Sequence, residues 1–168
     1  MLRNRWTFAA VIWFLLLPAA QAKSIKDPDP LFQDSGMIEI LLVAPFSEIM
    51  QQRSTEDEFD GQLHHSDEAG VSREFDIKIS ARGRTRLRKS VCPFAPLRLN
   101  FKKSQTDDTL FDKQDKLKLV THCRSNWESY EQYMLREYVA YQILNQVTDV
   151  SFRVRLLRVT YQDTDENK

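Results

Sequence analysis

The chain has 168 residues, of which 24 are basic and 24 acidic, so its formal net charge at pH 7 is zero. This balance excludes a strong global attraction to nucleic acid or to an anionic membrane surface. The four glycines are scattered, which excludes a collagen-like or repeat protein, and the length fits one domain with a substantial hydrophobic core.

Residues 1–22 have the features of a signal peptide. Arg3 and Arg5 precede an apolar run over 6–17, and the Ala-Gln-Ala sequence at 20–22 suits a signal peptidase. The run is shorter than the roughly 20 residues that span a bilayer, although an uncleaved N-terminal anchor is the alternative. Cleavage would remove two of the 24 basic residues and no acid, leaving 22 against 24. We therefore expect a periplasmic or secreted protein that is not an integral membrane protein.

The remaining chain is expected to form a flexible leader (23–35), a single α+β domain (36–162) and a polar tail (163–168). The leader is polar and broken by prolines. We interpret the acidic stretch 53–60 as a solvated loop, with a cation site as the alternative. Apolar alternation predicts strands, and one amphipathic stretch predicts a helix. The expected strands are 37–43, 61–65, 75–81, 97–102, 116–120 and 151–161, and the helix spans about 125–147.

This order of elements predicts an antiparallel or mixed sheet with one long helix packed on it. Ser125 and Glu128 have the spacing of a capping box, so the helix is expected to begin there and to end near Val147. One flank of the helix carries Glu137 in the middle of a set of tyrosines and aliphatic residues. That set is Tyr130, Tyr133, Met134, Ala140, Tyr141 and Leu144, and a second stripe is Leu135, Val139 and Ile143.

Glu137 is a candidate site residue. If the aromatic flank faces the sheet, its carboxylate needs a cation or a proton, and Lys116 and Lys118 on the preceding strand could supply the charge. The alternative is that the aliphatic stripe faces the sheet and Glu137 points to water beside Arg136.

Arginine recurs at every second position from Arg82 to Arg88, so an extended backbone would place Arg82, Arg84, Arg86 and Arg88 on one face. Guanidinium groups suit phosphate, sulfate or carboxylate oxygens. The alternative is a solvated edge strand whose charges prevent pairing with other sheets. The same two interpretations apply to three arginines near the last strand: Arg153, Arg155 and Arg158.

Cys92 and Cys123 are expected to form a disulfide in an oxidising compartment. A metal site that adds His122 and the pair His64 and His65 is the alternative, but these spacings match no zinc template. The sequence has no Gly-rich phosphate loop, nucleophile elbow or His-Glu-x-x-His motif. We expect no metal site.

Five segments between 73 and 161 resemble the spore-coat-protein-H-like (CotH) family of atypical secreted kinases, in an uncharacterised bacterial exported branch. They are Arg82-Gly83 after a strand, Pro-Leu-Arg-Leu-Asn-Phe-Lys-Lys (96–103), Lys-Leu-Lys-Leu (116–119), Leu-Arg-Glu-Tyr-Val-Ala-Tyr (135–141) and Phe-Arg-Val-Arg-Leu (152–156). The resemblance implies a kinase N-lobe-like sheet in which Glu137 is the helix glutamate and Lys116 or Lys118 the strand lysine. It also implies that Arg82 and Gly83 face a nucleotide, with ATP and Mg²⁺ or Mn²⁺ as cofactors.

Members of that family continue into a second lobe with catalytic and metal-binding acids, for which we find no counterpart. Asp163 and Asp165 lie too close to the last strand to replace them. We therefore expect no catalytic residue and an exported, non-catalytic domain. It would bind an anionic ligand near Arg82, Arg84, Lys116, Lys118 and Glu137. The alternatives are half of an active secreted protein kinase and an envelope structural protein that binds anionic polymers.

Overall fold

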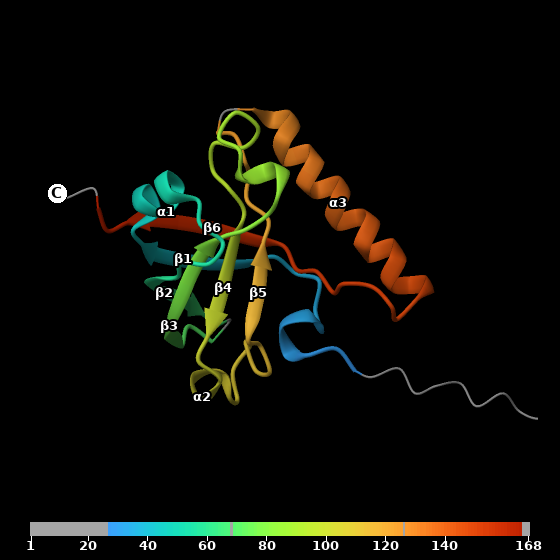
Figure 1. Cartoon of the computed structure of the whole chain (residues 1–168). Helices are drawn as coiled ribbons and strands as arrows, with labels where there is room; N and C mark the ends of the chain where they lie inside the picture. Colours follow the sequence, from blue (N-terminus) through green and yellow to red (C-terminus); the bar gives the residue numbers. More distant parts are fainter. Residues whose placement is uncertain (1–26, 68, 126, 166–168) are drawn as a thin grey trace, which may run out of the picture.

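The computed structural model describes residues 27–67, 69–125 and 127–165 (Figure 1). The predicted signal peptide (1–22), the first residues of the leader and residues 166–168 of the predicted tail lie outside the described residues. The strands are β1 (Ile38–Ala44), β2 (Phe59–Ser66), β3 (Ser72–Ala81), β4 (Leu97–Phe101), β5 (Lys116–Leu119) and β6 (Leu157–Asp163). The α-helices are α1 (Phe46–Gln52), α2 (Lys103–Thr106) and α3 (Glu128–Val147), and the 3-10 turns are η1 (Pro30–Phe32) and η2 (Thr85–Leu87).

The six strands form one mixed sheet in the order β5-β4-β3-β2-β1-β6. β1 to β5 pair antiparallel with their neighbours, whereas β6 pairs parallel with β1. The connection from β5 to β6 contains α3 and therefore passes from one edge of the sheet to the other (Figure 1). The prediction of an α+β domain with a mixed sheet is confirmed.

The core lies on the inner face of this curled sheet. Alternation in β3 buries Phe75, Ile77 and Ile79, and Ile79 pairs in register with Leu99 of β4. Phe111, in the loop after α2, lies against the rings of Phe75 and Phe101. Other buried residues are Leu31, Ile40, Leu42, Ala44, Phe46, Ile49, Leu63, Ala81, Ala95, Leu97 and Leu119. The sheet thus fills its inner face with its own side chains and a few from loops and α1.

Phe94 brings the two edges of the sheet together. Its ring lies 5.2 Å from His122, which follows β5, and 4.9 Å from Tyr161 of β6. The backbone N–H of Phe94 donates to the carbonyl of Cys123, and the Thr121 hydroxyl donates to the carbonyl of Phe94. Burial raises the pKa of Tyr161 and lowers that of His122.

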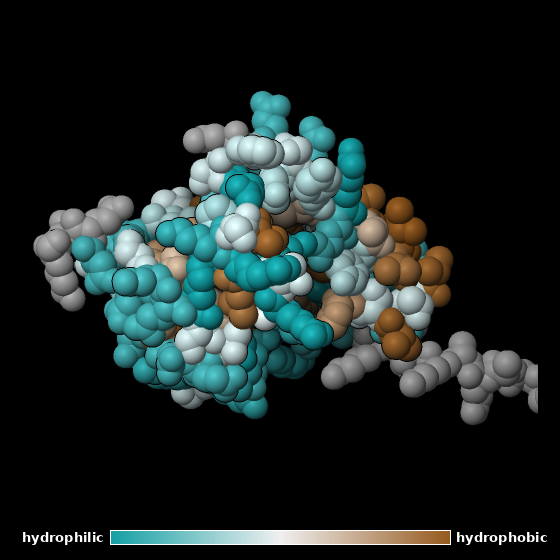
Figure 2. All heavy atoms as spheres, turned by 45° about the horizontal axis from the view of Figure 1, so that its top comes forward, coloured by the Kyte–Doolittle hydropathy of each residue, from teal (hydrophilic) through white to brown (hydrophobic). Residues whose placement is uncertain are grey.

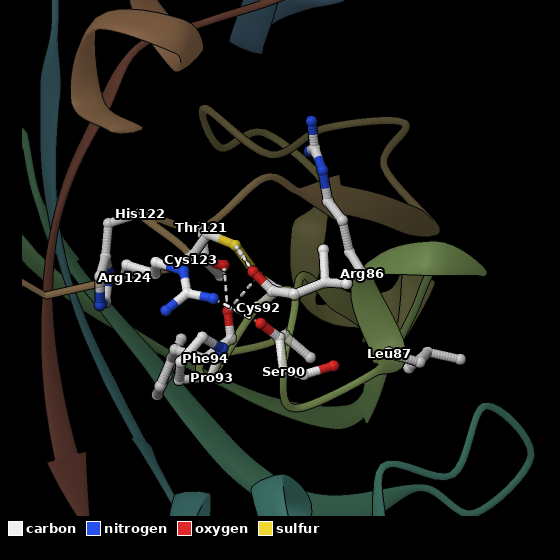
Figure 3. Close-up of a disulfide and its surroundings, with 12 residues drawn as sticks. Arg86, Leu87, Ser90, Cys92, Pro93, Phe94, Thr121, His122, Cys123 and Arg124 are labelled. Atoms are coloured by element: carbon white, nitrogen blue, oxygen red, sulfur yellow. Dashed lines mark hydrogen bonds between the residues drawn. A yellow bond between two sulfur atoms is a disulfide. The ribbon is translucent and has the colours of Figure 1, made fainter. Parts of the chain in front are cut away.

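A disulfide joins Cys92 to Cys123 beside this aromatic group, as predicted (Figure 3). Both cysteines are buried, and the guanidinium of Arg124 donates to the carbonyl of Ser90 next to them. The bond ties the loop before β4 to the segment that follows β5. It therefore reinforces the contact that Phe94 makes between the two edges of the sheet.

The short helix α1 is capped by a residue from the far end of the sequence, and no local pattern predicted this helix. Its N-cap is Pro45, whose side chain makes no capping hydrogen bond. The Asp163 carboxylate instead accepts hydrogen bonds from the Ser47 N–H (2.8 Å) and the Ser47 hydroxyl (2.6 Å). Burial raises the pKa of Asp163, but these bonds and others from the Asp165 and Phe46 backbones outweigh it and hold the pKa below its usual value.

Arg155 fixes the segment before β1. Its side chain is 6% exposed, forms an ion pair with Asp34 and donates to the carbonyls of Asp34, Gly36 and Leu31. Leu31, in η1, is buried in the core. A hydrogen bond from Gly36 and the charge of Arg155 lower the pKa of Asp34. The second half of the predicted leader is thus anchored to the domain.

The helix α3 ends at Val147, as predicted, but begins differently. Its N-cap is Trp127, without a side-chain hydrogen bond, and the Ser125 hydroxyl lies 3.3 Å from His122 Nε2. The predicted capping box is therefore wrong. The expected packing of α3 on the sheet is also wrong, because none of its described residues is buried and the helix stands away from the strands (Figure 1). Side chains of the strands, the loops and α1 already fill the inner face of the curled sheet, so α3 is not needed to cover it.

We predict that replacing both cysteines, Cys92→Ser with Cys123→Ser, lowers the free energy of unfolding by about 3–4 kcal/mol, because the bond closes a long loop of the unfolded chain. Urea denaturation would measure the loss. Reduction of the unmodified protein should lower stability by a similar amount and leave the double variant unchanged. Equal urea midpoints for the oxidised protein and the double variant would contradict the prediction.

We predict that Asp163→Ala lowers stability by about 1 kcal/mol at pH 7, the usual loss for a missing helix cap. Because the folded-state pKa is lowered, this contribution exists above the unfolded pKa and is lost as pH falls through the folded pKa, below about pH 4. Urea denaturation at pH 7 and pH 3 would measure it. Ser47→Ala should show a smaller loss with the same pH dependence, and a pH-independent difference for Asp163→Ala would argue against the cap.

Candidate functional site

Cations gather on the outer face of the sheet at β3, β4 and β5. Arg98 of β4 pairs in register with Ser80 on one side and with Lys118 on the other. Arg82 follows β3 and extends this pairing through a hydrogen bond from its N–H to the carbonyl of Pro96. With Arg86 from η2, these residues form a basic cluster, defined as Arg82, Arg86, Arg98 and Lys118. Like charges directly opposite one another on neighbouring strands are destabilising, so the cluster needs compensation.

Three of the four cations have compensating partners. Arg98 donates to the carbonyl of Thr55 at 2.6 Å and lies 3.9 Å from the Glu58 carboxylate. The Lys118 ammonium lies over the ring of Phe152, 4.6 Å from its centroid, in a cation–π contact. Arg86 lies 3.7 Å from the carboxylate of Glu137 on α3.

Arg82 is the exception. It is half-buried, and no hydrogen bond or ion pair joins its guanidinium to another residue in the described part of the chain. Burial, followed by the charges of Arg86 and Arg98, lowers its pKa, and Glu137 only partly opposes this. A desolvated cation that is repelled by two neighbouring cations is unfavourable until an anion approaches.

Two further polar atoms near Arg82 are buried without a hydrogen-bond partner among the described residues. They are the hydroxyl of Ser80 and the Nε of Arg98, which belong to paired positions of β3 and β4. Ser80 itself is fully buried. Unsatisfied buried donors are uncommon in folded proteins, and both groups can donate to an oxygen. The excess of positive charge around Arg82 at this end of the outer face favours an anionic oxygen ligand.

The predicted row of four arginines on one face is wrong, because the backbone is not extended there. Gly83 has φ +122°, a value that favours glycine, and residues 85–87 form η2. Arg84 and Arg88 are exposed, and Arg86 points away from the disulfide (Figure 3). Of the alternating set, the structure brings together Arg82 and Arg86.

Glu137 is not the buried partner of a strand lysine. Its side chain is 41% exposed and pairs with Arg86, while Lys118 is held by Phe152 and Lys116 is exposed at the start of β5. The predicted orientation of the helix is only partly correct. On the tyrosine flank Tyr130, Met134 and Tyr141 are half-buried, but Tyr133, Ala140 and Leu144 are exposed, as are Leu135, Val139 and Ile143 of the second stripe. Because α3 stands away from the sheet, its glutamate reaches the η2 loop and not β5.

Each of the three arginines near the last strand forms an ion pair with an acidic residue of the same domain. Arg153 pairs with Asp149, Arg155 with Asp34 and Arg158 with Glu39. The sequence could not separate these residues from Arg82 and Arg86, because arginines recur at short intervals in both segments. It also missed Arg98 as a site residue, although its alternation with Leu97 and Leu99 places it on the outer face.

The described residues contain no group of three or more His, Cys, Asp or Glu side chains placed to hold a metal ion. Over the same part of the chain, none of the helices has the length and apolar character needed to cross a bilayer. No protein-family model, curated protein or solved structure matches this chain. The assignment of function therefore depends on the basic cluster itself.

We predict that Glu137→Gln changes the free energy of unfolding by less than about 1 kcal/mol, because exposed ion pairs contribute little. Thermal and urea denaturation of the variant at pH 7 would test this. Arg155→Gln is the comparison, since its side chain is buried and bonded to several carbonyls, and it should be clearly more destabilising. A large loss for Glu137→Gln would show that the carboxylate is buried and essential to the fold.

Proposed function

We propose that this chain is an exported, non-catalytic α+β domain that binds an anionic group at the basic cluster. The observation that carries the proposal is Arg82, a half-buried guanidinium without an acidic partner and next to two other arginines. A bound anion would complete the compensation at Arg82 that the charge of Glu137 supplies only in part. The nearby carboxylates, Glu58 and Glu137, are engaged by Arg98 and Arg86.

The ligand chemistry follows from the donors. Guanidinium groups bind the oxygens of phosphate, sulfate or carboxylate groups through paired N–H donors. Arg82 provides such a group, and the charges of Arg86 and Arg98 beside it add to the attraction for an anion. Glu137 competes with the ligand for Arg86 and favours ligands with more than one negative charge.

The proposal also includes an exported location and a relationship to CotH-like kinases. A buried disulfide is consistent with an oxidising environment such as the periplasm or the cell exterior. A relationship to CotH-like kinases would place Arg82 and Gly83 beside a nucleotide phosphate. If the chain is instead part of an active secreted kinase, the ligand would be ATP with Mg²⁺ or Mn²⁺.

The test is Arg82→Met compared with Arg73→Met. Both changes remove one positive charge from β3 or its end, but Arg73 lies at the opposite end of that strand. Thermal unfolding would be followed with increasing inorganic phosphate or sulfate, with chloride at matched ionic strength. We predict that the unmodified protein and Arg73→Met gain about 2.7 kcal/mol at an anion concentration of 100 Kd, and that Arg82→Met gains little.

The ligand-free proteins provide a second readout. Because the Arg82 guanidinium is desolvated and repelled, Arg82→Met should unfold at the same temperature as the unmodified protein or at a higher one. Equal anion responses in Arg82→Met and the unmodified protein would contradict the proposed site. A response to chloride as large as that to phosphate would show general salt screening and no binding site.

A further inference from the structure

One face of α3 is linked to two cations of the basic cluster. The carboxylate of Glu137 lies 3.7 Å from the guanidinium of Arg86. One helical turn further on, the ring of Tyr141 makes an edge contact with Phe152, and the ammonium of Lys118 lies over that second ring. Residues four apart share one face of a helix, so the same face of α3 makes both links.

The other contacts of α3 hold it only weakly. None of its described residues is buried, and Figure 2 shows hydrophobic side chains at the surface on the side of the molecule where α3 lies. Tyr138 donates to the carbonyl of Ser35 and Gln142 to that of Val154, each at the long distance of 3.4 Å. The links to the basic cluster are therefore a substantial part of what holds this helix in place.

Glu137 occupies the role that a bound anion would have. Its charge acts on Arg82 as well as on Arg86, and it partly opposes the effects of burial and of neighbouring cations on the Arg82 guanidinium. A carboxylate offers guanidinium groups the same kind of oxygen as a phosphate or sulfate does. The side chain is 41% exposed, so water and an incoming anion can both reach it.

We propose that α3 is an autoinhibitory element of the anion site, an inference that rests on the proposed function. In the ligand-free protein, Glu137 pairs with Arg86 while Phe152 holds Lys118. A bound anion replaces the Glu137 carboxylate at Arg86 and releases α3 from the basic cluster. Anion binding and the attachment of α3 therefore oppose each other, by a factor that is the same in both directions.

The links are weak enough to be reversible. An exposed ion pair contributes little to stability, and an exposed cation–π contact contributes a similar amount. Competition with Glu137 is therefore expected to lower the affinity for an anion by about three- to fivefold. An anion with more than one charge overcomes this competition, because it attracts Arg82 and Arg86 more strongly than a single carboxylate does.

The test is Glu137→Gln compared with Glu131→Gln, in the full chain with its disulfide intact. Both changes remove one acid from α3, but Glu131 lies in the first turn, where its charge acts on His122. Calorimetric titration with inorganic phosphate, at an ionic strength held constant with chloride, would give the Kd. Glu137→Gln should bind phosphate about three- to fivefold more tightly than the unmodified protein, and Glu131→Gln should bind it like the unmodified protein.

Amide hydrogen exchange would follow α3 itself. Amides of a loosely held helix exchange faster than those of a firmly held one. Phosphate should therefore speed exchange over Glu128–Val147 in the unmodified protein, whereas the amides of β3 and β4 should slow or stay unchanged. In Glu137→Gln, α3 should exchange faster already without phosphate, and phosphate should change its exchange little.

A second pair of variants tests the same coupling without changing Glu137. Phe152→Leu removes the ring that holds Lys118, and Val150→Ala changes a nearby side chain that is 94% exposed. Phe152→Leu should bind phosphate more tightly than the unmodified protein, with faster exchange of α3. Val150→Ala should change neither quantity.

The outcomes separate this proposal from the anion site itself. If phosphate binds the unmodified protein and not Arg82→Met, an unchanged Kd in Glu137→Gln or slower exchange of α3 with phosphate would overturn the autoinhibition and leave the site standing. Equal gains in affinity for Glu137→Gln and Glu131→Gln would show a general effect of net charge and would also overturn it. Absence of phosphate binding in every protein tested, Glu137→Gln included, would overturn the site and the autoinhibition together.

Discussion

The contact of Phe94 with both edges of the sheet is the constraint on which the rest of this structure depends. A six-stranded sheet leaves two edges open, and here the residues after β5 and those of β6 meet at one ring. The disulfide fixes the same place covalently. Because the sheet curls, its inner face can be filled by its own strands, and the outer face is left to polar residues. Because the inner face is already filled, none of the described residues of α3 is buried against it.

The sequence predicted the parts of the fold that local patterns determine. The runs 75–81, 97–102 and 116–120 alternate apolar and polar residues, and each forms a strand with bounds close to those expected. The disulfide was predictable from two cysteines in a chain with a signal-like start. The helix α1 was not predictable, because its cap comes from Asp163, far away in the sequence. Pro45, at the N-cap position, makes no side-chain capping bond, so no local capping pattern indicates a helix there.

The candidate site was predictable by residue type but not by arrangement. Alternation of arginines from Arg82 suggested an anion site, yet the turn at Gly83 keeps Arg84 and Arg88 out of it. Arg98 and Lys118 enter the cluster only because β4 and β5 pair in a particular register, which the sequence does not specify. Glu137 was expected to meet a lysine of β5 on the assumption that α3 packs on the sheet. The closed core leaves no apolar surface there for the helix to cover.

The distribution of acids around the basic cluster argues for a ligand over a purely structural role. Acidic and basic residues are equal in number, so carboxylates are not scarce. Arg153, Arg155 and Arg158 each have an acidic partner, and Arg155 is neutralised although it is nearly buried. A fold that needed Arg82 only for stability would be expected to pair it in the same way, because a half-buried guanidinium that is repelled by two neighbouring cations lowers stability. Local arrangements that reduce stability are expected mainly at functional sites, and this one lies where two further buried donors also lack partners within the described residues.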